Sequence, residues 1–125
     1  MSKDDICRGF YGLDPKMVDF IEKAEGLIRY HRLPFKVFET LRTSERQKTL
    51  VEAGYSKTMK SKHLDGRAVD FVAHISGRWS WAKEHEFWYE ILEKFLTSKF
   101  YDIVLAGANW KTFRDLPHYQ LRDDV

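Results

Sequence analysis

The sequence predicts a small α+β domain in which helices and short antiparallel strands share one hydrophobic core. Apolar residues recur at helical spacing in some segments, and shorter β-prone segments lie between them. A length of 125 residues suits one core rather than two, and 43% hydrophobic residues exclude global disorder. We therefore expect a single domain over residues 1–125, with a small antiparallel sheet and about three helices.

The first helix is expected to begin at Pro15. Asp14 is a favourable N-cap residue, and proline is favoured in the first helical turn. Over about four turns, the apolar residues then share one face of the predicted helix. These residues are Met17, Phe20, Ile21, Ala24, Leu27 and Ile28.

After Pro34 the sequence changes to a period of two, which predicts a strand from Phe35 to Arg42. Ser44 and Gln47 then have the Ser-x-x-Gln spacing of a capping box, and Gly54 is a typical C-terminal stop. We expect a short second helix between them. Residues 55–66 have no sustained period and are rich in polar groups, which indicates a functional surface loop.

Residues 68–73 form a short β-type run in which Asp70 interrupts apolar neighbours. A turn around Ser76 and Gly77 is expected to lead into a third helix. Its apolar residues are interpreted as core rather than as a ligand platform. They are Trp81, Phe87, Trp88, Ile91, Leu92, Phe95 and Leu96.

Two more strands are expected near the C-terminus. Residues 103–105 are a brief apolar run that Gly107 breaks, and residues 118–121 can extend with His118 and Gln120 on one face.

Composition excludes several classes of protein. The net charge is +2 with dispersed basic residues, so nucleic-acid binding is not expected. One cysteine excludes an internal disulfide, and no run of about 18 apolar residues predicts a membrane span. No apolar segment follows Met1–Asp5, so we expect no export signal.

The candidate chemistry lies in two short segments. His63 in the loop and Asp70 in the next strand are separated by Gly66, which permits a sharp turn, and His118 supplies a second imidazole. Two histidines and one aspartate meet the requirement of a catalytic zinc site, and Asp115 is a candidate base. From spacing alone, a solvent-exposed histidine and an edge-strand aspartate remain the alternative interpretation.

Residues 61–70 read Ser-Lys-His-Leu-Asp-Gly-Arg-Ala-Val-Asp, and residues 115–118 read Asp-Leu-Pro-His. This pair resembles the SxHxxGxAxD and DxPH signature of the zinc D-alanyl-D-alanine carboxypeptidase family, which includes phage L-alanyl-D-glutamate endopeptidase endolysins. Residues 39–47 and 107–110 are similar to further segments of that family. The resemblance implies the fold of the lysostaphin, carboxypeptidase and hedgehog group.

The resemblance also implies roles for individual residues. His63, Asp70 and His118 would bind Zn²⁺, and Asp115 would be the catalytic acid and base. Arg42 would lie beside the metal, bind the substrate and stabilise the oxyanion, although a surface salt bridge is the alternative.

Two further residues are candidates for substrate binding. Gln47 also fits a capping role, and Ser61 also fits ordering of the metal loop, which we rank first. The chain departs from the family pattern at residues 107–109 and at Gln120, where relatives carry an acidic residue. None of these positions is an expected metal ligand, so the departures leave open the substrate choice and the orientation of the imidazoles that the resemblance implies.

The resemblance implies an endolysin-type peptidase that hydrolyses the L-alanyl-D-glutamate bond of the peptidoglycan stem peptide. We expect a monomer that accumulates in the host cytoplasm, reaches the wall through a holin-type permeabilising protein, and carries no separate wall-binding domain. The alternatives are a D-alanyl-D-alanine carboxypeptidase or dipeptidase, and a catalytically silent wall-binding module of the same fold.

Overall fold

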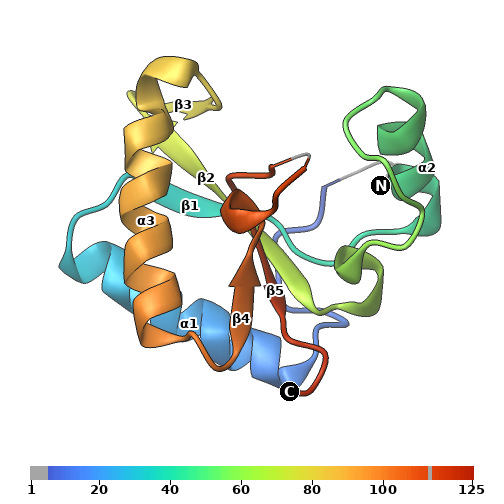
Figure 1. Ribbon diagram of the computed structural model, residues 1–125, viewed down its shortest axis with the longest axis horizontal. Coiled ribbons are helices and arrows are strands. Elements are labelled where there is room, and N and C mark those ends of the chain that lie inside the picture. Colours follow the sequence, from blue (N-terminus) through green and yellow to red (C-terminus); the bar gives the residue numbers. More distant parts are fainter. Residues whose placement is uncertain (1–5, 113) are drawn as a thin grey trace.

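The computed structural model describes residues 6–112 and 114–125, so the prediction about residues 1–5 lies outside the described part of the chain. Within these ranges, no helix is long and apolar enough to cross a membrane. The elements are α1 (Pro15–Tyr30), β1 (Phe35–Glu39), α2 (Ser44–Glu52), the 3-10 helix η1 (Lys62–Asp65), β2 (Ala68–Ile75), β3 (Arg78–Ser80), η2 (Lys83–His85), α3 (Glu86–Lys99), β4 (Val104–Ala106), η3 (Gly107–Asn109) and β5 (His118–Leu121) (Figure 1).

The strands form one antiparallel sheet in the order β1-β2-β5-β4, and β3 pairs with the far end of β2. Asp70 lies opposite His118 in the pairing of β2 with β5, and opposite Glu39 in the pairing of β1 with β2. Side chains directly opposite one another in a sheet share a face and lie close together. The predicted α+β class is therefore confirmed, and the register brings three polar side chains to one face of the sheet.

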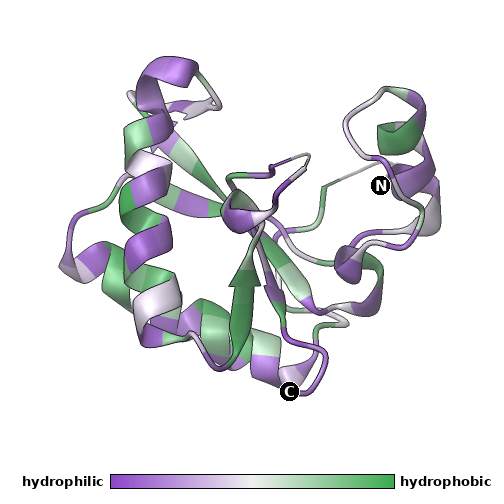
Figure 2. Cartoon of the chain, in the orientation of Figure 1, coloured by the Kyte–Doolittle hydropathy of each residue, from purple (hydrophilic) through white to green (hydrophobic). Residues whose placement is uncertain are grey.

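The opposite face of the sheet carries the hydrophobic core. Val69 and Phe71 alternate with Asp70 along β2 and pack with buried residues of α1 and α3. Phe20 of α1 makes edge-to-face contacts with Phe71 and Phe100, at ring-centroid distances of 6.5 and 5.1 Å. Figure 2 shows hydrophobic and hydrophilic residues alternating along both helices, as expected for helices with one buried face. The hydrophobic core thus supports β2 on the face opposite Asp70.

The prediction for α1 is confirmed at its N-terminus. The Asp14 carboxylate accepts a hydrogen bond of 2.9 Å from the amide of Lys16, and Pro15 is the first helical residue. The expected strand from Phe35 is shorter than predicted, because β1 ends at Glu39.

The predicted capping box of α2 is wrong. Thr43, not Ser44, is the N-cap, and its hydroxyl accepts a hydrogen bond of 3.1 Å from the amide of Arg46. Gln47 therefore lies one position beyond the capping-box position, and its side chain is free for other contacts.

The third helix was predicted to include Trp81, and this is also wrong. Ser76 and Gly77 both have positive φ and form a two-residue hairpin turn, after which β3 pairs with β2. Trp81 follows β3 and is 55% exposed, and Phe87 in the first turn of α3 is 50% exposed. Of the predicted core residues, Leu92 and Leu96 are fully buried.

Candidate active site

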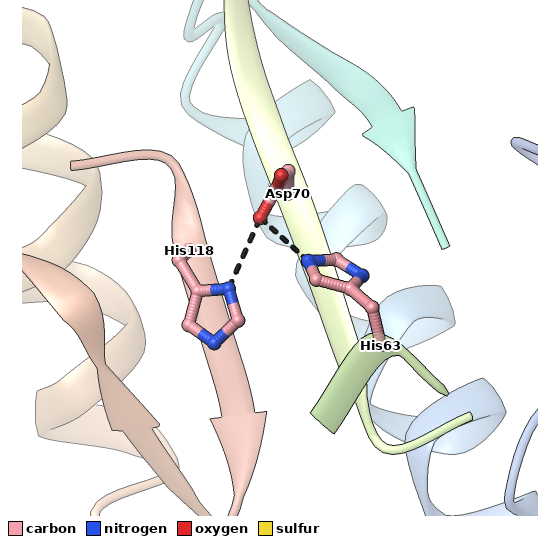
Figure 3. A group of neighbouring side chains, drawn as sticks. All are labelled: His63, Asp70 and His118. Atoms are coloured by element: carbon pink, nitrogen blue, oxygen red, sulfur yellow. Dashed lines mark hydrogen bonds and ion pairs between the residues drawn. The ribbon is translucent and has the colours of Figure 1, made fainter. Parts of the chain in front are cut away.

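Three side chains from three elements meet at one end of β2 (Figure 3). Nε2 of His63 lies 3.0 Å from Oδ1 of Asp70, and Nδ1 of His118 lies 3.2 Å from the same oxygen. The potential ligand atoms of the three residues all lie within 4.8 Å of one another. We call this group the His/Asp cluster. The structure thus brings together the three residues that were predicted to bind zinc.

Local backbone structure places His63. The Ser61 hydroxyl caps η1 by accepting a hydrogen bond of 3.2 Å from the His63 amide. Gly66 ends η1 with a φ of +69°, and its carbonyl accepts a hydrogen bond of 3.0 Å from the amide of Asp14. A Cβ atom at Gly66 would lie only 3.0 Å from Cα of Leu13. Glycine is therefore needed for the chain to reverse from His63 into β2.

The outer nitrogens of both imidazoles are hydrogen-bonded. Nδ1 of His63 lies 2.7 Å from the carbonyl oxygen of Thr40, which can only accept, so this nitrogen carries the proton. Nε2 of His118 lies 2.9 Å from Oε1 of Gln120. This amide oxygen is an acceptor, so the outer nitrogen of His118 is also assigned the proton. In a neutral ring the inner nitrogen then directs its lone pair towards the Asp70 carboxylate, and in a protonated ring it donates a hydrogen bond to that carboxylate. This donor set fits a divalent cation bound by two imidazoles and one carboxylate.

The electrostatics of the cluster reflect the same geometry. Burial alone would raise the pKa of Asp70, but the charge and hydrogen bond of His63, together with those of His118, outweigh burial and hold the pKa well below its usual value. Burial would lower the pKa of His118, but its hydrogen bond to Asp70 and the nearby carboxylates raise it above its usual value. The carboxylate is therefore ionised at neutral pH and attracts positive charge to this point.

Asp115 is half-buried in the loop between η3 and β5. It lines a cavity that covers the His/Asp cluster. Its amide donates a hydrogen bond of 3.1 Å to the carbonyl of Gly107, and its carbonyl accepts one of 3.2 Å from the amide of His118. Burial, together with the charge of Asp70, raises the pKa of Asp115 to about 6 against the opposing charges of His118, His63 and Arg42. A carboxylate with this pKa can exchange protons near neutral pH.

Arg42 lies beside the cluster, with Nη2 3.7 Å from Oδ2 of Asp70. Nη2 also donates to Glu39 at 2.8 Å, and Nη1 donates to Gln47 at 2.8 Å. Glu39 is buried and is also bound by Arg46 through two nitrogens. Nε of Arg42 is buried without a hydrogen-bond partner among the described residues. Arg42 is thus held in a buried ionic network rather than in a surface salt bridge.

Gln47 is fully buried and does not line the cavity. Its amide nitrogen donates to the Ser56 hydroxyl at 2.9 Å and to the Thr58 carbonyl at 2.5 Å, while its oxygen accepts from Arg42. The structure therefore places this predicted substrate-binding residue behind Arg42, where it joins Arg42 to the loop that follows α2.

A cavity of about 890 Å³ covers the cluster. It contains the predicted residues Arg42, Ser61 and Asp115, and also several residues that the sequence did not indicate. The Trp110 ring, for example, lies 5.0 Å from the imidazole of His118. Glu39 also lines the cavity. The sequence feature that could have indicated it is a carboxylate among the apolar residues of the alternating β1 pattern. The other unpredicted lining residues include Phe38, Lys57, Lys60 and Trp81.

Comparison with known proteins agrees with this geometry. The sequence model of the phage L-alanyl-D-glutamate peptidase family matches residues 8–122. The L-alanyl-D-glutamate peptidase of Listeria phage A118 is 34% identical over 84 residues, which cover 67% of this chain and 29% of that protein. The chain thus spans under a third of the length of this curated relative.

Two solved structures are similar to the chain. The Serratia marcescens L-Ala D-Glu endopeptidase ChiX superimposes with a TM-score of 0.70 at 35% identity, over 95% of this chain and 91% of that chain. The vancomycin resistance D,D-pentapeptidase VanY, solved in complex with Zn(II), superimposes with a TM-score of 0.63 at 17% identity, over 94% and 79% of the two chains. The second likeness shows a common fold. By the extent of the family match, which confirms the resemblance seen in the sequence, this chain belongs to the phage L-alanyl-D-glutamate peptidase family.

Proposed function

We propose that this chain is a zinc-dependent peptidase that hydrolyses the L-alanyl-D-glutamate bond of the peptidoglycan stem peptide. The observation that carries the proposal is the convergence of His63, Asp70 and His118 beneath a cavity that Asp115 also lines. Membership of the family, and the similarity to an L-Ala D-Glu endopeptidase over nearly the whole chain, support the choice of bond.

The metal ligands in this proposal are Nε2 of His63, Oδ1 of Asp70 and Nδ1 of His118. When bound, zinc would polarise the scissile carbonyl and lower the pKa of a water molecule towards neutrality. Three protein ligands are the number that catalytic zinc sites use, whereas structural sites use four, so zinc held by these residues would keep a position for water.

Asp115 is the general base and then the general acid. Its ionised carboxylate accepts a proton from the water that attacks the alanyl carbonyl carbon. As the carbon–nitrogen bond breaks, the carboxylic acid returns this proton to the nitrogen of D-glutamate, which leaves as an amine. A pKa of about 6 suits both transfers at neutral pH.

Arg42 contributes positive charge beside the reacting carbonyl. Its terminal nitrogens already donate to Glu39 and Gln47, so the network holds the guanidinium in place before substrate binds. Ser61 orders the turn that carries His63, and Gln47 acts as a positioning residue for Arg42.

We further propose that the protein acts as a monomer on the cell wall of a phage-infected host. It would require a holin-type permeabilising protein to leave the host cytoplasm. Family membership supports the phage-infected host as the setting, since the curated relative is a phage protein.

The proposal is tested by incubating the zinc-loaded protein with purified peptidoglycan and identifying the new peptide termini by mass spectrometry. Free L-alanine carboxyl ends and new D-glutamate amino ends are expected. Release of D-alanine alone would instead identify a D-alanyl-D-alanine carboxypeptidase or dipeptidase.

A matched variant tests the alternative of a catalytically silent wall-binding module. Asp115→Asn keeps the three metal ligands and the shape of the cavity, so it is expected to bind zinc and to lose hydrolysis. Binding to the wall without any new termini from the unsubstituted protein would contradict the proposed peptidase.

A further inference from the structure

The cavity above the His/Asp cluster has two chemically different sides. Residues 55–62, between α2 and η1, form one side and contribute Lys57, Lys60 and Lys62. In Figure 1 this segment lies with α2 on the right, whereas β3, which Trp81 follows, lies on the upper left. On that side the cavity is lined by Phe38 and Trp81, whose ring centroids lie 5.1 Å apart, and Trp110 lies over His118 with its ring centroid 5.0 Å from that of the imidazole.

Among the described residues, three carboxylates line the cavity: Glu39 and Asp70 are held by other partners, and Asp115 lies in the loop before β5, outside the lysine segment. Glu39 is bound by Arg42 and Arg46, and Asp70 lies between the two imidazoles. Lys62 pairs with Asp123 at 2.9 Å, outside the cavity lining. Lys60 is exposed, and none of the ion pairs found among residues 6–112 and 114–125 includes it. This side of the cavity therefore favours an anionic group of the ligand.

The backbone that carries Lys60 is anchored to the buried network. Gln47 donates hydrogen bonds to Ser56 and to the Thr58 carbonyl while it accepts one from Arg42. The amide of Lys60 in turn donates to the Thr58 hydroxyl at 2.9 Å. A single buried amide thus fixes the lysine segment relative to Arg42, and a pre-organised site loses less free energy in ordering when it binds.

The proposed substrate has a matching asymmetry. A glutamate residue within a peptide uses one of its two carboxyl groups in the chain and keeps the other, which is ionised at neutral pH unless it is amidated. The alanyl half carries only a methyl group. The apolar side of the cavity suits the alanyl half, and the cationic side suits the glutamyl half.

We propose, as an extension of the proposed function, that Lys60 binds the free carboxylate of the D-glutamate residue and that the enzyme thereby distinguishes this carboxylate from its primary amide. Lys60 is a specificity-determining residue that acts on substrate binding, so its effect belongs in KM rather than in kcat. An exposed lysine–carboxylate contact is worth roughly a 1.5- to fivefold change in affinity, and the effect weakens as salt increases.

The test uses two synthetic stem peptides that differ only at this group, one with the free carboxylate and one with the amide. KM and kcat are measured with the zinc-loaded protein, with Lys60→Met and with Lys94→Met. Lys94 lies on the exposed face of α3 outside the cavity, so Lys94→Met removes the same charge elsewhere. The expected result is a roughly 1.5- to fivefold lower KM for the free carboxylate. This preference should be lost in Lys60→Met and retained in Lys94→Met.

Equal KM values of the two peptides with the unsubstituted protein would overturn the inference and leave the proposed peptidase intact. A preference that survives in Lys60→Met would overturn it equally. If the unsubstituted protein cleaves neither the peptides nor purified peptidoglycan, the proposed function itself fails. A loss of kcat with unchanged KM in Lys60→Met would also contradict a role in carboxylate binding.

Discussion

Nε2 of His118 lies 2.9 Å from Oε1 of Gln120, two residues further along the same strand. The amide oxygen accepts a hydrogen bond from the outer nitrogen and so directs Nδ1 towards Asp70. Because Gln120 shares a face of β5 with His118, the strand itself sets this contact.

Replacing Gln120 by leucine is expected to weaken zinc binding by about 10- to 100-fold, since the imidazole loses the acceptor that orients it. Gln120→Glu should retain or strengthen binding, because a carboxylate accepts the same hydrogen bond. Competition with a chromogenic chelator measures both affinities. Equal affinities in the leucine variant and the unsubstituted protein would show that Gln120 does not orient the ring.

Zinc is expected to stabilise the folded protein. At a free concentration 100 times the dissociation constant, the stabilisation is about 2.7 kcal/mol, which raises the melting temperature by roughly ten degrees. Thermal melts with zinc and with chelator should differ for the unsubstituted protein and coincide for His63→Ala. His31→Ala removes an exposed imidazole outside the cavity and should keep the difference.

Asp115→Asn is expected to lower kcat by about 10²- to 10⁴-fold, the usual contribution of a general base. Its zinc content should not change, because Asp115 is not one of the proposed ligands. Asp102→Asn, at an exposed position, is the matched control and should retain full activity. Loss of zinc together with activity in Asp115→Asn would show that the carboxylate supports the metal site instead.

The rate should also depend on pH through the same group. The base must be ionised, and the pKa of Asp115 is raised to about 6, so kcat/KM should fall as pH decreases through this region. A bound cation favours the ionised form, which moves the midpoint to pH 6 or below. Profiles measured at saturating zinc separate this effect from protonation of the histidine ligands. A rate that is constant from pH 7 to pH 4 would contradict the assignment.

Gly107→Ala is expected to damage the site more than the fold. A Cβ atom at this position would lie 3.0 Å from Cβ of His118 and 3.1 Å from Cβ of Asp115, so both residues would have to move. Activity should fall by at least tenfold, since small displacements of catalytic groups are costly. Gly26→Ala in α1 meets no atom within 4 Å and should instead stabilise the helix by about 0.5–1 kcal/mol.

Much of this site could be predicted because its chemistry lies in short, ordered segments. Asp70 was conspicuous as a carboxylate within an apolar strand, and the sequence around His63 and His118 carried the family pattern. These local signals fixed which residues to consider, while the register of β2 with β5 brought them together. Their metal-binding and catalytic roles stay predictions until the measurements above are made.

Other features depended on contacts between distant segments. Thr43 and Ser44 are both residue types that favour the N-cap position. The helix begins at Ser44, so Thr43 is the N-cap, and the local sequence does not distinguish the two. Trp81 matched a helical period, but the hairpin turn at Ser76 and Gly77 continued the sheet before the helix began. The role of Gln47 depended on the path of residues 55–60, which has no periodic signal. Pattern alone could not resolve these competing local preferences.

The pairing of Asp70 with His118 across two adjacent strands limits how related chains can change in length. A one-residue insertion within either strand would reverse the face on which its later residues lie and would separate the two side chains. Insertions between the strands leave this pairing intact, because surface connections tolerate added length. Members of the family can therefore acquire new surface segments between β2 and β5 while the reacting centre stays the same.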